Sequence, residues 1–148
     1  MRLDFSKERV LAVVAHPDDC ELLCAGTLAR ARDDGAPIGL CVMCQGEKGQ
    51  GSAGHGNLAE VRRKELEAAT AILGAELLRC EFGDGTLFDS EDQRRTLIEV
   101  FRVFRPTLVL AHAPNDYHPD HRAASALAEA ASWFCASRGH RTKSPPLD

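Results

Sequence analysis

The stretch Val10-Leu-Ala-Val-Val-Ala-His-Pro-Asp-Asp19 joins an apolar run to a compact group of polar side chains. Residues 10–14 are aliphatic without polar alternation, which is typical of a strand buried on both faces of a sheet. Pro17 ends the strand, because its ring fixes φ, removes a backbone donor and biases His16 toward an extended conformation. A histidine and two aspartates therefore emerge at the carboxyl end of a buried strand, where open α/β sheets bind their ligands.

A second polar group, Tyr117-His-Pro-Asp-His-Arg122, follows another apolar run at residues 107–111. Proline suits the first position of a helix, so we expect a helix from Pro119 with His118 and His121 on one face at its start. Imidazole nitrogens and carboxylate oxygens are ordinary ligands for zinc and its neighbours. The two groups together predict a metal site; the alternative is a capped turn and two solvated histidines.

The rest of the chain alternates strand-like and helix-like segments. Strands are expected at 38–44 and 76–82, and helices at 21–34, 58–73, 90–104 and 119–135. Four strands that alternate with helices favour right-handed crossovers onto a parallel sheet. The sequence therefore predicts an α/β fold, a Rossmann-like three-layer sandwich with a mainly parallel sheet.

Two of these helices have an expected buried face. In the helix at 21–34 the apolar residues at helical spacing include Leu22, Leu23 and Leu28. In the helix at 58–73, which is capped by Asn57 and ended by Gly74, they are Leu58, Val61, Ala68, Ala69 and Ile72. We expect these faces to pack on the sheet.

The overall composition is that of one globular domain, with 148 residues, of which 44% are hydrophobic and 27% charged. We expect the domain to cover residues 1–136 and residues 137–148 to form a loop or tail, since no periodicity continues there. The net charge of −4 offers no electrostatic case for nucleic acid. No segment has the length of a signal peptide's apolar region or of a membrane span, which predicts a cytoplasmic protein.

The six cysteines are interpreted mostly as reduced core residues, because a disulfide framework is typical of short secreted chains. Cys41 and Cys44 have the spacing of a redox or zinc pair, but they lie in a strand-like run, where positions i and i+3 face opposite sides. The core interpretation is therefore favoured for both.

A glycine-rich loop at residues 46–56 has five glycines in eleven residues. It lacks the Walker pattern, and the dinucleotide fingerprint is absent after the first strand, so a rim loop over the crevice is favoured over a phosphate cradle. A nucleotide-binding Rossmann domain is the weaker alternative. His55 in this loop and His112 at a strand end are interpreted as surface residues or as residues that support the ligands.

The pairing of Ala-His-Pro-Asp-Asp at 15–19 with His-Pro-Asp-His at 118–121 resembles the LmbE-like (PIG-L) family of metal-dependent de-N-acetylases. This family includes the phosphatidylinositol glycan class L, mycothiol and bacillithiol pathway deacetylases. The likeness extends over most of the chain, to Gly26-Thr27, the glycine-rich loop, Arg62-x-x-Glu65 and Leu73-Gly74.

Carried over residue by residue, the resemblance implies that His16, Asp19 and His121 bind Zn²⁺, or another divalent metal such as Fe²⁺. It implies that Asp18 is the general base. It also implies that His118 polarises the amide or stabilises the oxyanion.

The resemblance further assigns Arg62 and Asp84 to substrate binding. The alternatives are an exposed helix charge for Arg62 and a turn-forming carboxylate for Asp84. Asp120 is expected to orient a histidine ligand.

The implied reaction is hydrolysis of an N-acetyl group from an N-acetylglucosamine-like amino sugar, a small-molecule substrate. The alternative is a non-catalytic metal- or ligand-binding α/β protein with an incomplete pocket. Two features depart from the family pattern: Cys20 stands where Glu is frequent, which places a thiol next to an expected ligand, and family members usually continue with further strands. A homo-oligomer is compatible with the sequence but not specified by it.

Overall fold

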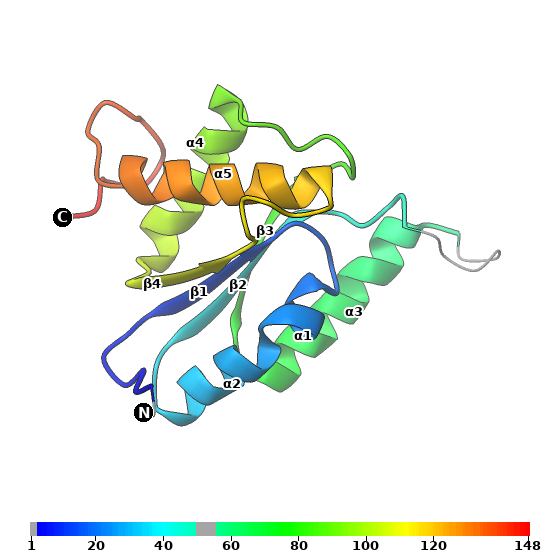
Figure 1. The fold of residues 1–148 in the computed structure, drawn as a ribbon, viewed down its shortest axis with the longest axis horizontal. Helices are drawn as coiled ribbons and strands as arrows, with labels where there is room; N and C mark the ends of the chain where they lie inside the picture. Colours follow the sequence, from blue (N-terminus) through cyan, green and yellow to red (C-terminus); the bar gives the residue numbers. More distant parts are fainter. Residues whose placement is uncertain (1–2, 50–55) are drawn as a thin grey trace.

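The computed structural model describes residues 3–49 and 56–148 (Figure 1). Its elements in chain order are β1 (Val10–Val14), α1 (Asp19–Leu23), α2 (Ala25–Asp33), β2 (Ile38–Cys44), α3 (Leu58–Leu73), β3 (Glu76–Phe82), α4 (Glu91–Phe104), β4 (Leu108–Ala111) and α5 (Pro119–Phe134). The strands form one sheet in the order β3-β2-β1-β4, and every pairing is parallel. The predicted α/β fold with a parallel sheet is confirmed.

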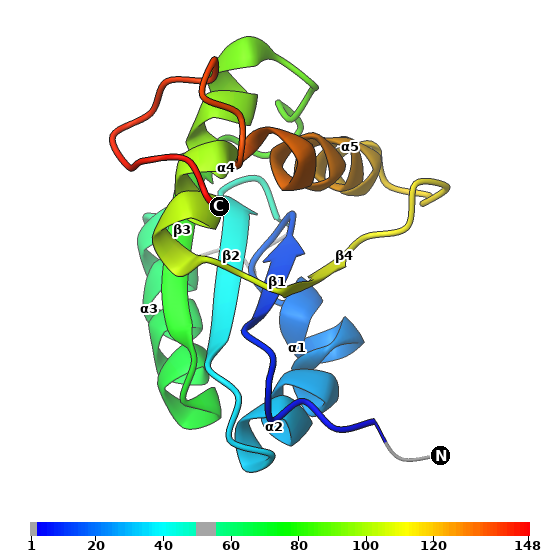
Figure 2. The same ribbon diagram turned by 90° about the vertical axis from the view of Figure 1, so that its left-hand side faces the viewer.

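The sheet is the middle of three layers. Helices α1, α2 and α3 cover one face, and α4 and α5 cover the other (Figures 1 and 2). Strands β1 and β2 lie in the centre and are buried at every position, as their uninterrupted apolar runs predict. Each large aliphatic or aromatic side chain buried between the layers contributes about 1.5–3 kcal/mol.

The expected helix at 21–34 is two helices. It begins earlier, at Asp19, and it is broken at Cys24, whose φ of −142° and ψ of 2° are not helical. Leu22 and Leu23 are 81% and 64% exposed. The expectation that they pack on the sheet is wrong, because α1 is only one short turn and the break separates its orientation from that of α2.

Helix α3 has the expected bounds, and the Asn57 side chain accepts a hydrogen bond from the backbone N–H of Glu60 at its start. Its buried residues, however, are Leu66 and Thr70, whereas Ile72 is 84% exposed. The apolar spacing therefore predicted a buried stripe beside the one that is observed, because the residues that pack on the sheet lie on a neighbouring part of the helix surface.

None of the helices among the described residues combines the length and the hydrophobicity that a membrane crossing would need. The longest, α3 and α5, have 16 residues each. Both pack on the sheet with one face and carry charged residues on the other.

The segment after α5 has neither helix nor strand, yet it packs against α4 through one buried guanidinium. Arg102 is 4% exposed. Its Nε donates to Cys135 O (2.9 Å), Nη2 to Ser137 O (2.8 Å) and Nη1 to Thr142 Oγ1 (2.9 Å). A side chain of α4 therefore holds the C-terminal segment in place.

Arg102→Ala is expected to lower the free energy of unfolding by about 3 kcal/mol, because three carbonyls and a hydroxyl lose the donor that Arg102 supplies and a cavity remains. Urea denaturation measures this loss. Arg95→Ala is the matched control on the same helix, since the Arg95 pairs with Glu91 and Asp92 are exposed and should be worth about 0.5 kcal/mol. Equal losses in the two variants would contradict the anchoring role.

Candidate active site

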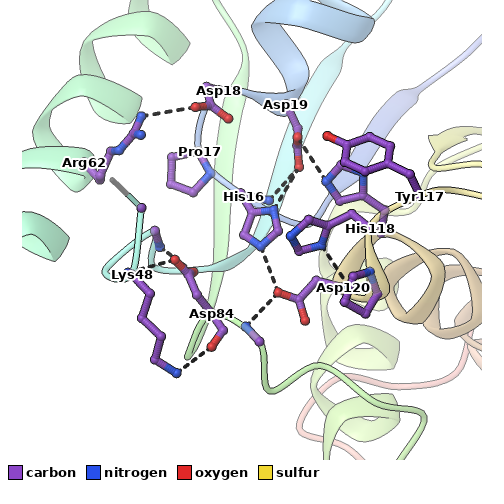
Figure 3. A pocket seen from close by; sticks show the side chains of 15 residues that line it. His16, Pro17, Asp18, Asp19, Lys48, Arg62, Asp84, Tyr117, His118 and Asp120 are labelled. Atoms are coloured by element: carbon purple, nitrogen blue, oxygen red, sulfur yellow. Dashed lines mark hydrogen bonds and ion pairs between the residues drawn. The ribbon is translucent and has the colours of Figure 1, made fainter. Parts of the chain in front are cut away.

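The two polar groups of the sequence meet at the carboxyl edge of the sheet. Strands β1 and β4 are parallel neighbours, so the segments that follow them lie side by side. They border a pocket of about 470 Å³ (Figure 3). This pocket is lined by every residue that the sequence assigned to the site: His16, Asp18, Asp19, Arg62, Asp84, His118 and His121.

Asp19 lies at the centre of the expected ligand set. Its Oδ1 is 3.3 Å from His121 Nε2, and its Oδ2 is 3.5 Å from His16 Nδ1 and accepts a hydrogen bond from the His16 backbone N–H at 2.8 Å. Burial alone would raise the pKa of Asp19, but the neighbouring side chains of His112 and His16 and the His16 backbone N–H lower it below its usual range. The carboxylate is therefore ionised between two imidazoles.

His16 is oriented from both edges of its ring. While Nδ1 faces Asp19, Nε2 lies 2.9 Å from Asp120 Oδ2, and Asp120 is itself held by the backbone N–H of Gly85 at 2.7 Å. Burial alone would lower the pKa of His16, but hydrogen bonds with Asp19, Cys44 and Asp120 raise it to about 11. The cluster thus favours a positive charge at this point, whether it is a proton or a metal ion.

The tautomers of the two α5 histidines follow from their partners. His118 caps α5, and its Nδ1 accepts from the backbone N–H of Asp120 at 3.1 Å, which leaves the ring proton on Nε2. His121 Nδ1 lies 3.0 Å from Asp116 Oδ1, so its Nε2 lone pair faces Asp19. Burial lowers the pKa of His121, which favours the neutral form that binds metals.

His112 takes a part in the site that the sequence did not make clear. Its side chain is 1% exposed, its Nε2 accepts from the Ala15 backbone N–H at 3.0 Å, and its ring stacks on His121 with 3.9 Å between centroids. The surface alternative is therefore wrong for His112, whose buried ring contacts Asp19 and His121. Its position directly after the apolar strand β4 was the available signal.

The donor set suits a borderline divalent cation. Ligand atoms of His16, His118 and His121 lie within 4.8 Å of one another, and so do those of Asp19, His112 and His121. Mixed nitrogen and oxygen donors of this kind fit Zn²⁺ and also Fe²⁺.

Asp18 and Asp19 point apart, as neighbouring residues of a turn can (Figure 3). Asp18 has a φ of 95°, a left-handed conformation that costs a non-glycine residue about 1–3 kcal/mol and is concentrated at functional sites. Its half-exposed carboxylate lies 3.3 Å from Arg62 Nη1. Asp18 is therefore presented to the pocket without contacting the Asp19 cluster.

Asp84 holds the first part of the glycine-rich loop. Its Oδ1 accepts from the Gly46 backbone N–H at 2.9 Å and its Oδ2 from the Lys48 backbone N–H at 3.0 Å. Asp84 therefore stabilises a loop on another part of the chain, a structural role that neither the turn-forming alternative nor the substrate assignment described. Of the loop itself, residues 50–55, with His55, lie outside the described residues.

The thiol beside the site is Cys44 rather than Cys20. Cys20 is 1% exposed and belongs to the hydrophobic cluster under α1 and α2, with its Sγ 3.8 Å from Cys24 Sγ. Cys44, at the end of β2, interacts with His16.

The core interpretation of Cys41 and Cys44 is confirmed, since both are buried and free. They belong to one hydrophobic cluster and not to opposite faces of the sheet. A register shift between Val42 and Cys44 changes the alternation at the end of β2.

Cys20→Ala is expected to keep near-parental metal affinity, because among the described residues Cys20 belongs to no group of candidate ligands. Metal content after dialysis and oxidant sensitivity measure this, and both should change little. Loss of metal with an unchanged circular dichroism spectrum would show that Cys20 is a ligand after all.

The model of the family described as GlcNAc-PI de-N-acetylase (PIG-L) matches residues 11–132. This stretch contains both polar groups and nearly the whole sheet. The chain belongs to the PIG-L family, and the resemblance seen in its motifs is confirmed.

Several known proteins are similar to the chain. Diacetylchitobiose deacetylase of Thermococcus kodakarensis is 32% identical over 126 residues, which cover 81% of this chain and 47% of that protein. 4-Oxalmesaconate hydratase of Pseudomonas putida is 28% identical over 143 residues, which cover 91% and 55%. The chain spans about half the length of the curated relatives it matches.

Two solved structures share the fold. A conserved protein of Thermus thermophilus has 39% identity and a TM-score of 0.82, with 95% of this chain and 62% of that chain covered. N,N'-diacetylchitobiose deacetylase of Pyrococcus horikoshii has 29% identity and a TM-score of 0.84, with 93% and 54% covered.

Proposed function

We propose that this chain carries the active site of a metal-dependent N-deacetylase, which hydrolyses the N-acetyl group of an N-acetylglucosamine-like amino sugar and releases acetate and a free amine. The observation that supports this most directly is the contact of Asp19 with both His16 and His121 in the pocket that also holds Asp18 and His118. The family and its deacetylase members support the substrate class.

The proposed ligands are His16 Nδ1, Asp19 and His121 Nε2. The other nitrogen of each ring meets a carboxylate, Asp120 for His16 and Asp116 for His121, which is the usual support of metal-bound histidines. A zinc ion bound here would supply a Lewis acid that lowers the pKa of water in its coordination sphere to about 7.

The remaining side chains move the proton and stabilise charge. Asp18 accepts a proton from the attacking water and later gives it to the departing amine. His118 donates from Nε2 to the substrate oxygen as negative charge develops there, since its Nδ1 is already occupied by the Asp120 backbone N–H. These two roles require that substrate lies between Asp18 and His118.

Arg62 and Asp84 are the proposed substrate contacts. The Arg62 guanidinium has five donors and uses one on Asp18. It makes no other hydrogen bond within residues 3–49 and 56–148, so its remaining donors can reach sugar hydroxyls. Asp84 uses one lone pair of each oxygen on the main chain, and its remaining lone pairs could accept from a hydroxyl. The cytoplasmic location, the division at residue 136 and a homo-oligomer stay predictions.

Acetate release tests the proposal. The metal-stripped protein is reconstituted with Zn²⁺ or Fe²⁺ and incubated with N,N'-diacetylchitobiose and with simple N-acetylglucosaminides, and acetate and free amine are measured. We expect equal amounts of both products with metal and none without it. Stoichiometric metal without acetate would contradict hydrolysis and favour the non-catalytic binding protein.

The hydratase relative makes water addition to a carbon–carbon double bond the second candidate reaction. Its similarity to this chain is comparable to that of the deacetylases, and a base beside a metal site serves either reaction. Loss of ultraviolet absorbance of a conjugated unsaturated dicarboxylate, with no acetate from the amino sugars, would favour this candidate.

Metal affinity is expected to fall as pH falls, because a proton and the metal compete for His16. With a pKa raised to about 11, the metal-free ring is doubly protonated at pH 7 and must release one proton when Nδ1 becomes a ligand. This group alone makes affinity rise about tenfold per pH unit below its pKa. Titration calorimetry in buffers of different ionisation enthalpy counts the proton, and release of none at pH 7 would contradict the competition.

A further inference from the structure

Cys44 lies where a thiol, an imidazole and a carboxylate converge. Its Sγ, a ring nitrogen of His16 and a carboxylate oxygen of Asp120 are all within 4.8 Å of one another. Cys44 is 4% exposed and Asp120 2% exposed. Within residues 3–49 and 56–148, Cys44 is the only cysteine that belongs to such a group.

This group lies at the edge of His16 that carries no ligand atom of the proposed deacetylase site, where Asp120 orients the ring. Nδ1 faces Asp19 at 3.5 Å, whereas Nε2 faces Asp120 at 2.9 Å (Figure 3). The lone pairs of the two ring nitrogens diverge, so a single ion cannot bind both. The Cys44 side of the ring is therefore a separate location.

We propose that Cys44 Sγ, Asp120 and His16 Nε2 form a second ion site, which takes a thiophilic divalent cation such as Cd²⁺ or excess Zn²⁺. A thiolate selects softer cations, and three protein ligands are enough for a zinc-like ion. When the ion binds, Cys44 loses its thiol proton and His16 loses its Nε2 proton, and both protons go to solvent without any change of oxidation state.

The second ion should bind more weakly than the first. Asp120 must share or give up its 2.7 Å hydrogen bond from Gly85, and the Cys44 thiol is buried, which raises its pKa. The ion can arrive through the pocket, since His16 and Asp120 line it. An ion bound at this second site would inhibit the proposed deacetylase, because His16 would be held between two cations. This inhibition is the only part of the inference that rests on the proposed function.

Cadmium binding tests the site without any assay of activity. The metal-stripped protein is titrated with Cd²⁺ while bound metal and the ultraviolet charge-transfer absorption of cadmium thiolate are recorded. We expect two ions per chain, and the thiolate absorption should grow only with the second. Cys44→Ser should keep the first ion, lose the absorption and weaken the second ion by about 10–100-fold or more.

Two pairs of cysteines that do not include Cys44 supply the controls. Cys20 and Cys24, and likewise Cys41 and Cys80, have sulfurs 3.8 Å apart, which is near enough to bind cadmium together. Cys24→Ser and Cys80→Ser should keep the thiolate absorption if Cys44 supplies the sulfur. Loss of the absorption in either of them, or its persistence in Cys44→Ser, would overturn the proposal.

Two further outcomes decide the remaining points. Thiolate absorption that saturates with the first equivalent would overturn a second site, because the sulfur would belong to the first. If Cys44→Ser does not fold by circular dichroism, Asp120→Asn replaces it, and an unchanged second affinity in that variant would also overturn the proposal. Absence of acetate release would refute the deacetylase function but leave these cadmium results unaffected.

Discussion

His121→Ala is expected to abolish stoichiometric metal binding at the deacetylase site. The variant removes Nε2, which lies 3.3 Å from Asp19 Oδ1, and leaves two of the three protein ligands that a catalytic zinc site requires. His121 also belongs to both candidate ligand groups that contain Asp19 or His118, so among the described residues no other histidine completes the set.

Metal content after dialysis against a weak chelator measures this loss. His140→Ala is the matched control, because His140 stacks on Phe134 outside the pocket and should keep the parental metal. His121→Ala should still bind cadmium weakly through a thiolate, since the group that contains Cys44 does not include His121. Tight, stoichiometric zinc in folded His121→Ala would refute the ligand assignment.

Asp18→Asn is expected to keep the metal and lower kcat by about 100-fold or more, because general-base catalysis contributes about 10²–10⁴-fold. The substitution should leave the turn intact. Asparagine tolerates the left-handed region that the φ of 95° at Asp18 requires, and its amide oxygen can still accept from Arg62.

The comparison requires kcat for acetate release and metal content from the same preparation. Asp33→Asn is the control, since Asp33 is an exposed carboxylate on α2 that pairs with Arg32, and it should keep the parental kcat. A parental rate in Asp18→Asn would mean that another group is the base.

The sequence by itself determined the elements and their order. Strands β1, β2 and β3 have the expected bounds, because apolar stretches bounded by turn residues are signals that act over a few positions. The same is true of α3, whose Asn57 cap and left-handed Gly74 are local features. The two polar groups were also visible, since the first directly follows β1 and the second follows β4 after a short connection.

Only the tertiary structure decided which side chains meet. His16 and Asp120 are 104 positions apart, and they meet because β1 pairs with β4 rather than with β3. The tertiary arrangement of the elements also decides that His112 is buried and that Ile72 is exposed. It likewise places Cys44, and not Cys20, near His16. Local patterns show which residues belong to an element, but strand order, register and helix breaks set their distances, and these depend on packing of the whole chain.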